Sequence, residues 1–143
     1  MTETAATDER RATCACGDVS VRVTGEPVFQ AIWACRNCQV RTGSAFGLSA
    51  YYPVDQVIER TGQTTTYRRV SDKNRWLDFR FCQTCGATVW REAEFMPDKV
   101  GISAGLFEDG RFAPDGAYFC ATKPDWVSFD GEIPTGSGPS AER

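Results

Sequence analysis

The cysteines, and the absence of histidine, constrain this chain more than any other feature of its sequence. Seven cysteines occur among 143 residues, while histidine does not occur at all. Without histidine there can be no Ser-His-Asp triad, no Cys-His pair and no imidazole ligand for a metal. Seven cysteines cannot all pair within one chain, and a cytoplasmic chain keeps most of its thiols reduced. Metal binding is therefore the leading explanation for the cysteines.

Six of the seven cysteines form three close pairs. The pairs are Cys14 and Cys16, Cys35 and Cys38, and Cys82 and Cys85. A glycine directly follows the first and the third pair, and glycine accepts the positive φ that a tight turn around an ion requires. These two pairs share one design, so we predict that they close a tetrahedral four-cysteine site of the structural zinc type. Buried reduced thiols, or a disulfide in an oxidising compartment, are the alternatives.

The remaining cysteines allow several interpretations. Cys35 and Cys38 could be part of a second metal site, a redox pair, or two thiols without a special role. Cys120 stands alone between Phe119 and Ala121, and we expect it to be a small buried hydrophobic residue.

Length and charge narrow the class of protein. The chain is long enough for one domain, and 41% hydrophobic and 24% charged residues are an ordinary globular balance. A formal net charge of -3 gives no basic surplus for binding nucleic acid. No apolar stretch is long enough to span a membrane, and the start of the chain lacks the apolar segment of a signal peptide, so we expect a cytoplasmic location. We expect a flexible leader at 1–11, a single zinc-binding β domain at 12–130, and a flexible tail, rich in Gly, Pro and Ser, at 131–143.

Short alternating segments dominate the rest of the chain. Valines at 19, 21 and 23 alternate with polar residues, and a second alternating segment at 77–81 runs directly into the Cys82 pair. Further strands are expected at 28–34, 45–52, 56–59, 64–70, 87–91 and 100–104, with one helical turn within 36–42 and a short helix or loop at 92–98. We therefore predict an all-β, zinc-bearing sandwich of short antiparallel strands with little helix.

The order of the cysteine motifs resembles the glutathione-dependent formaldehyde-activating enzyme family, which also includes the centromere protein V domain. The matching segments are Cys14-Ala15-Cys16-Gly17, Cys35 to Cys38, Gly43-Ser44-Ala45-Phe46, Phe81-Cys82-Gln83-Thr84-Cys85-Gly86 and Lys123-Pro124-Asp125-Trp126. The resemblance extends over about residues 12–126 and implies a zinc-bearing β-sandwich. It also implies a structural zinc on Cys14, Cys16, Cys82 and Cys85, the same four residues that the spacing selects.

The middle cysteine cluster departs from the family pattern. The family usually has three cysteines there, commonly with a histidine between the first two, and these thiolates hold a second, catalytic zinc. In this chain Trp33 stands in place of the first cysteine and Ala34 in place of the histidine. A tryptophan cannot bind zinc, so a second zinc would have to be held by Cys35 and Cys38 with other ligands. A core aromatic residue at a lost site is the alternative interpretation of Trp33.

The resemblance implies a carbon–sulfur lyase that acts on a thiol–aldehyde adduct, such as the adduct of glutathione and formaldehyde. Cys35 and Cys38 would then be the catalytic residues, with zinc lowering the pKa of the substrate thiol. Sequence proximity adds further candidates, which are Tyr51, Tyr52 and Asp55 for proton transfer and Arg36 and Arg41 for a substrate carboxylate. A non-catalytic, zinc-stabilised binding module and a dithiol redox protein are the alternative functions. Two bound zinc ions would favour the enzyme, and one would favour the module.

Overall fold

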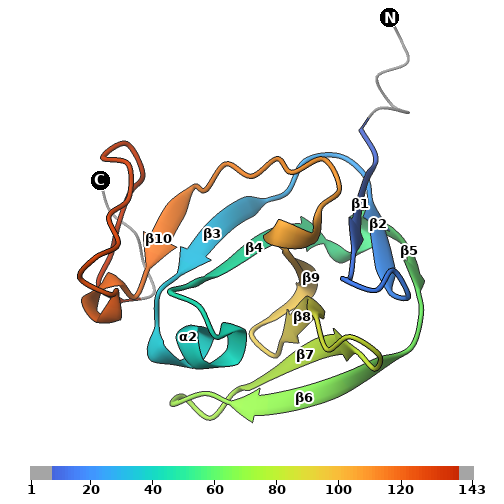
Figure 1. Cartoon of the computed structure of the whole chain (residues 1–143), viewed down its shortest axis with the longest axis horizontal. Coiled ribbons are helices and arrows are strands. Elements are labelled where there is room, and N and C mark those ends of the chain that lie inside the picture. Colours follow the sequence, from blue (N-terminus) through green and yellow to red (C-terminus); the bar gives the residue numbers. More distant parts are fainter. Residues whose placement is uncertain (1–7, 139–143) are drawn as a thin grey trace, which may run out of the picture. The chain divides into compact units, whose positions relative to one another are not determined.

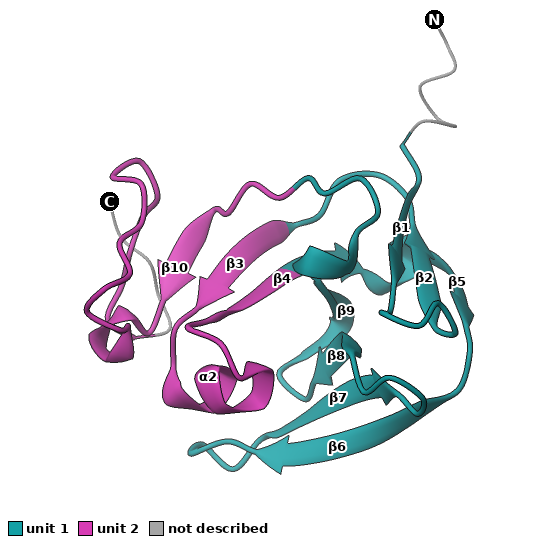
Figure 2. Cartoon of the chain, viewed as in Figure 1, with its two compact units in different colours: residues 1–28, 50–111 teal, residues 29–49, 112–143 magenta. Residues whose placement is uncertain are grey.

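The structure, a computed structural model, describes residues 8–138. They form two compact units, unit 1 with residues 8–28 and 50–111 and unit 2 with residues 29–49 and 112–138 (Figures 1 and 2). Short strands dominate both units, and antiparallel pairing prevails, so the predicted mostly β class with little helix is confirmed. The first strand begins at Arg10, inside the expected leader, while the rest of that leader up to residue 7 and the tail from residue 139 lie outside the described residues.

Unit 1 contains two sets of hydrogen-bonded strands. Its strands are β1 (Arg10–Thr13), β2 (Ser20–Val23), β5 (Val57–Thr61), β6 (Thr64–Val70), β7 (Trp76–Cys82), β8 (Thr88–Ala93), β9 (Met96–Ser103) and the later part of β4 (Gly47–Pro53). One set has the order β1-β2-β5, and the other has the order β4-β9-β8-β7-β6. Two short 3-10 turns, η1 (Val54–Gln56) and η2 (Ala104–Leu106), also belong to this unit.

Apolar side chains from both sets of strands form the core of unit 1. Val19, Val21 and Val23 are fully buried there, as the alternation along β2 predicts. Burial of each such side chain contributes roughly 1.5–3 kcal/mol of transfer free energy. The other members of the core are Ala12, Cys14, Ala50, Tyr52, Cys82, Val89, Trp90, Val100, Ile102 and Phe107. Two of the predicted metal ligands, Cys14 and Cys82, are therefore anchored in the core itself.

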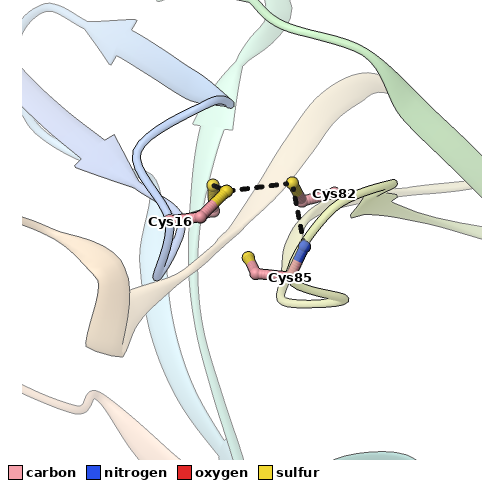
Figure 3. Close-up of side chains that lie close together, drawn as sticks. Cys16, Cys82 and Cys85 are labelled. Carbon is pink, nitrogen blue, oxygen red and sulfur yellow. Dashed lines mark hydrogen bonds between the residues drawn. The ribbon is translucent and has the colours of Figure 1, made fainter.

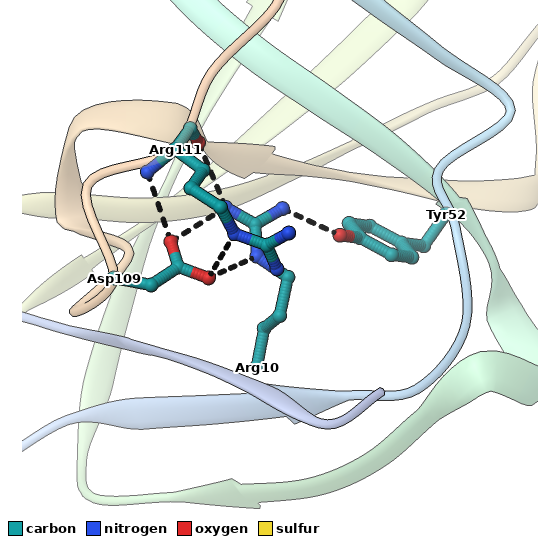
Figure 4. Close-up of polar contacts among 4 residues, drawn as sticks. All are labelled: Arg10, Tyr52, Asp109 and Arg111. Carbon is teal, nitrogen blue, oxygen red and sulfur yellow. Dashed lines mark hydrogen bonds and ion pairs between the residues drawn. The ribbon is translucent and has the colours of Figure 1, made fainter. Parts of the chain in front are cut away.

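An ion pair between the largely buried side chain of Arg10 and the partly exposed side chain of Asp109 connects β1 to the chain segment that follows η2 (Figure 4). The Arg10 guanidinium binds both carboxylate oxygens of Asp109, at 2.8 and 2.9 Å, and donates to the Tyr52 hydroxyl at 2.9 Å. The same guanidinium stacks over the ring of Phe107, 3.9 Å from its centroid. These contacts hold the pKa of the Asp109 carboxyl well below its usual range. The hydrogen bonds from Arg10 are the main cause, and they outweigh burial, which alone would raise the pKa.

Unit 2 is built around the helix α2 (Arg36–Thr42). Its strands are β3 (Phe29–Trp33), β10 (Gly116–Tyr118) and the beginning of β4, in the order β10-β3-β4, and β10 runs parallel to β3. The helix ends at Gly43, which has a φ of 67° and donates its N–H to the Gln39 carbonyl. The buried Gln39 amide donates to the carbonyls of Ala34 and Thr122, so it fixes α2 against the turn η3 (Cys120–Thr122). The helical turn predicted at 36–42 is thus present.

Candidate metal centre and thiol pair

The first cysteine pair lies in a closed turn between β1 and β2. The Gly17 N–H donates to the Cys14 carbonyl at 3.1 Å, and the Cys14 N–H donates to the Val19 carbonyl at 2.9 Å. Gly17 has a φ of 88°, a conformation in which other residues are strained. The glycine after the pair therefore lets the chain reverse tightly enough to turn both sulfurs in one direction.

The pair at the end of β7 repeats this arrangement. The Gly86 N–H donates to the Cys82 carbonyl at 2.9 Å, and the Cys82 N–H donates to the Ala87 carbonyl at 3.0 Å. Gly86 has a φ of 79°. Each turn thus closes with a hydrogen bond from the N–H of its first cysteine to the carbonyl five residues later, which confirms that the two glycine-followed pairs share one local design.

The two turns bring four sulfur atoms together. The sulfurs of Cys14, Cys16, Cys82 and Cys85 all lie within 4.8 Å of one another. The Sγ atoms of Cys14 and Cys16 are 3.7 Å apart, and those of Cys16 and Cys82 are 3.6 Å apart (Figure 3). A tetrahedral site with Zn–S bonds of about 2.3 Å has S–S edges of about 3.8 Å. The four sulfurs therefore fit one tetrahedral ion, and they are much farther apart than the roughly 2.05 Å of a disulfide.

Backbone N–H groups surround these sulfurs. The Val19 N–H donates to the sulfur of Cys14 at 3.2 Å, and the Thr84 N–H donates to the sulfur of Cys82 at 3.3 Å. The Thr84 hydroxyl also donates to the Asp18 carboxylate at 3.2 Å, which joins the two turns directly. Such donors stabilise negatively charged sulfur, as a thiolate metal site requires.

The pKa values of the surface thiols diverge. The backbone N–H of Ala87, followed by the backbone of Cys16, lowers the pKa of Cys85 to about 6. The backbone N–H of Asp18 also lowers the pKa of Cys16, but desolvation and the hydrogen bonds with the neighbouring thiols outweigh it and raise that pKa to about 12. Four thiols this close together cannot all ionise without a compensating positive charge, and a divalent cation supplies that charge.

The second pair of cysteines lies at the start of α2. Cys35 is the residue that caps this helix, and its sulfur accepts the N–H of Cys38 at 3.4 Å. Among residues 8–138, the cluster of Cys14, Cys16, Cys82 and Cys85 is the one group of three or more cysteine or acidic residues placed to hold an ion. Cys35 and Cys38 are not members of that group.

Trp33, the residue at which the middle cysteine cluster departs from the expected pattern, is firmly packed in unit 2. Its Nε1–H donates to the Ser49 hydroxyl at 2.6 Å, and its ring stacks on Tyr118 with centroids 4.8 Å apart and contacts Phe119 at 6.3 Å. An indole N–H is a donor and cannot bind a metal. The residues present here do not fit a three-thiolate zinc site, and the interpretation of Trp33 as a packed aromatic residue agrees with these contacts.

The other candidate residues from the sequence are divided between the two units, with the tyrosines and Asp55 in unit 1 and the arginines in unit 2. Tyr52 accepts a hydrogen bond from Arg10 inside the core of unit 1, and Asp55 is exposed in η1. Arg36 is exposed and donates to the Gln39 side chain at 2.5 Å, and Arg41 lies in the last turn of α2. The remaining tyrosine candidate, Tyr51, is buried in unit 1 beside Gly101.

The prediction for Cys120 was wrong about its burial. This residue is only partly buried, and its thiol donates to the Ala117 carbonyl at 3.5 Å at the start of η3. The apolar neighbours Phe119 and Ala121 suggested a core position, but Phe119 has a φ of 59° and turns the chain away from a regular strand there.

Sequence reasoning missed Arg91, a buried arginine in β8. Its exposed fraction is 4%, although the neighbouring residues of the strand gave no sign of a buried charge. The pairing of β7 and β8 skips Val89, so Val89 and Trp90 both belong to the core. This bulge breaks the simple alternation that would have placed Arg91 from sequence alone.

These features define a mostly β protein with a four-cysteine cluster that could hold a metal ion. A family model described as "Glutathione-dependent formaldehyde-activating enzyme" matches residues 9–122, and the chain belongs to this family. A crystal structure of a Rhodobacter sphaeroides protein has the same fold, with a TM-score of 0.54, 21% sequence identity, and coverage of 68% of this chain and 87% of that chain. A comparison with curated proteins found no match. Within residues 8–138, no helix is both long and apolar enough to cross a membrane.

Proposed function

We propose that Cys14, Cys16, Cys82 and Cys85 hold one zinc ion with a structural role. Support comes from the S–S distances of 3.6 and 3.7 Å, the backbone donors to sulfur and the family membership. The bound ion would cross-link two turns that are 66 residues apart in the chain, as measured from Cys16 to Cys82. Apparent binding energies of structural zinc are on the order of 10 kcal/mol or more, so the ion would contribute a large part of the stability of unit 1.

We further propose that the chain acts on a thiol–aldehyde adduct of the glutathione–formaldehyde kind, as a carbon–sulfur lyase with a depleted second metal site. The family match over residues 9–122 carries this proposal. In the forward direction the thiol sulfur forms a bond to the carbonyl carbon, and the thiol proton moves to the carbonyl oxygen; the reverse reaction breaks the same bonds. Cys35 and Cys38 are the residues that we assign to this chemistry.

Because Trp33 leaves no three-thiolate site for a second zinc, we assign two roles to the chain in this reaction. It binds the thiol and the aldehyde, and it transfers the thiol proton. Alignment of the thiol and the aldehyde supplies much of the rate gain in such an addition. The Cys35 sulfur, which already accepts the Cys38 N–H, is the group that we assign to taking and returning the thiol proton. Cys38 is buried and fixes the position of that sulfur.

The packing of Trp33 favours a second candidate, a non-catalytic module that binds a small thiol or its adduct. Its hydrogen bond to Ser49 and its stacking on Tyr118 fill the position at which the family has a metal ligand. Such a module would keep the four-cysteine zinc and bind its ligand without accelerating any reaction.

Two-dimensional exchange NMR on glutathione and formaldehyde measures both binding and the rate of adduct formation. We expect the purified chain to contain one zinc and to accelerate exchange, Cys35→Ser to reduce the acceleration at least tenfold, and Cys120→Ser to leave it unchanged. Glutathione binding without any acceleration in the wild type would establish the module instead. Trp33→Cys tests the depleted site, because restoring the third thiolate is expected to raise the zinc content toward two per chain.

A further inference from the structure

Arg91 is a buried cation without an acidic partner. The side chain is 4% exposed, and among residues 8–138 it forms no ion pair. One terminal nitrogen donates to the Ser103 hydroxyl at 3.2 Å, and its Nε has no hydrogen-bond partner in the described part of the chain. A buried charge is costly unless an opposite charge and hydrogen bonds compensate it. The guanidinium therefore keeps a positive charge and at least one donor, Nε, that the described residues do not use.

A second arginine lies on the same face of the strands. Arg91 is directly opposite Phe79 in the pairing of β7 and β8, and Arg69 is directly opposite Leu77 in the pairing of β6 and β7. Leu77 and Phe79 are two residues apart in β7 and therefore share a face, so both arginines lie on the face of Phe79. The guanidinium carbons of Arg91 and Arg69 are 5.5 and 5.8 Å from the centroid of the Phe79 ring. The ring stabilises these cations only weakly, because a cation–π contact does not replace the charge of a carboxylate.

The acidic residues of these strands belong to the opposite face. Asp78 binds Arg68 through both oxygens, at 2.7 and 3.0 Å, and Glu92 pairs with Arg80 at 3.0 Å. Successive residues of a strand alternate between its faces, so these carboxylates point away from the side of Phe79. The face of Phe79 therefore carries Arg69 and Arg91, and by the same alternation Lys99, while the carboxylates of β7 and β8 lie on the opposite face.

Gly101 leaves room for this arrangement. It is opposite Arg91 in the pairing of β8 and β9, and a Cβ atom there would lie 2.8 Å from the Tyr51 ring and 3.0 Å from the Arg91 Cγ. The contact with the Tyr51 ring is shorter than real Cβ contacts and the contact with Arg91 is tight, so any larger residue would displace Tyr51. The glycine thus allows an aromatic ring and the arginine stem to approach each other closely.

We propose that Arg91, assisted by Arg69, binds a carboxylate group of a small anionic ligand on the Phe79 face of unit 1. A guanidinium matches a carboxylate with two parallel hydrogen bonds, and the unpartnered Nε supplies one of these donors. The aromatic and largely buried environment of Arg91 strengthens such a pair, because opposite charges attract more strongly where water is excluded. The choice of a thiol peptide as the ligand rests on the proposed function, but the carboxylate site itself does not.

The test is a titration with S-methylglutathione, which keeps both carboxylates and has no thiol with which to bind zinc or add to an aldehyde. Binding is followed by NMR for the zinc-loaded wild type and for the variants Arg91→Met, Arg91→Lys and Arg80→Met. We expect at least tenfold weaker binding for Arg91→Met, a smaller loss for Arg91→Lys, and no change for the control Arg80→Met on the opposite face. The dimethyl ester of the probe is expected to bind the wild type at least tenfold more weakly.

The outcomes separate this inference from the proposed function. Binding that depends on Arg91 and on the free carboxylates supports the site even where the wild type does not accelerate adduct formation. Equal binding by the wild type and Arg91→Met, or equal binding of the probe and its ester, overturns the site and leaves the lyase proposal standing. A wild type that does not bind the probe also overturns it. Should Arg91→Met not fold, Arg91→Lys and the ester give the same decision.

Discussion

At the scale of single residues, the four clustered cysteines differ in how deeply they are buried in the core of unit 1. Cys14 and Cys82 are buried members of the core of unit 1, whereas Cys16 and Cys85 lie at the surface. Loss of a buried cysteine would remove a bond to the proposed zinc and leave a defect in the core, while loss of a surface cysteine would remove that bond alone. The buried positions are therefore the more sensitive ones.

Replacement of one buried ligand tests this difference. We expect Cys82→Ser to abolish zinc binding and soluble folding, because the ion contributes part of the folding free energy and a serine would bury an unpaired hydroxyl. Cys120→Ser is the matched control, since that thiol lies outside the cluster and makes one weak hydrogen bond. Zinc content and thermal unfolding measure both variants. A Cys82→Ser protein with full zinc and an unchanged Tm would contradict the assignment of the cluster.

The cysteine cluster could be predicted because its geometry is mostly local. The spacing of the cysteines and the glycine after each pair can be seen in short segments of the sequence. A tetrahedral zinc needs four ligands, which indicates that the two distant cysteine pairs come together. The charge on Arg91 could not be predicted, because its burial depends on a bulge in β8 and on residues from β4 and β9. Long-range packing of this kind leaves no pattern in the neighbouring sequence.

At the scale of elements, the tight turns position the metal centre. Gly62, in the turn between β5 and β6, has a φ of 95° and lies against the backbone of Asp18. A Cβ atom at this position would be 2.1 Å from the Asp18 carbonyl oxygen. The turn between β5 and β6 therefore supports the loop that carries the first cysteine pair.

We expect Gly62→Ala to destabilise the protein by about 3 kcal/mol, the sum of the left-handed backbone strain and the clash with Asp18. Gly110→Ala is the matched control, because Gly110 has a φ of 69° but nothing within 4 Å of the added atom, so it should cost about 1 kcal/mol. Denaturant unfolding of the zinc-loaded proteins gives both values. Equal losses in the two variants would show that the contact with Asp18 contributes nothing.

Strand prediction succeeded where one face is buried and failed where turns are short. The valines that alternate along β2 are buried in the core, and the apolar residues that alternate along β7 share the face of Phe79, so both strands were located correctly. Residues 92–98 were expected to be a short helix or loop, but β8 continues to Ala93 and β9 begins at Met96. The prediction failed because charged residues near a tight hairpin do not show the alternation of a half-buried strand.

At the scale of the whole molecule, long-range contacts hold the ends of unit 1 together. The Arg10–Asp109 pair joins residues 99 positions apart, and the pocket beside it, about 410 Å³ in volume, is lined by charged side chains. Glu9, Arg10, Arg11, Arg22, Glu108 and Asp109 form that lining. The lining of this pocket therefore carries charges of both signs.

Asp109→Asn tests this pair through its pH dependence. A carboxyl whose pKa is lowered by folding stabilises the protein above its unfolded pKa of about 4, and that contribution is lost as the pH falls below this value toward the folded pKa. We expect the variant to be less stable by about 2 kcal/mol between pH 5 and 8, discounted for the partial exposure of Asp109, and the difference to shrink below pH 4.

Asp98→Asn is the control for this experiment, because Asp98 pairs with Lys99 at an exposed site and its loss should leave stability unchanged. Chemical unfolding of both variants and the wild type, each measured across the pH series, gives the differences directly. A deficit for Asp109→Asn that stays the same from pH 7 to pH 3 would mean that the carboxylate charge is not what stabilises the pair.

The separation of the two cysteine turns along the chain also has a consequence for biosynthesis. The first pair leaves the ribosome long before the second, so no newly made chain can complete the cluster until the strand ending at Cys82 has been synthesised. Until then its thiols are open to oxidants and to scavenging of stray metals. Cells short of zinc should therefore accumulate this protein as oxidised, degradation-prone chains rather than as a stable metal-free pool.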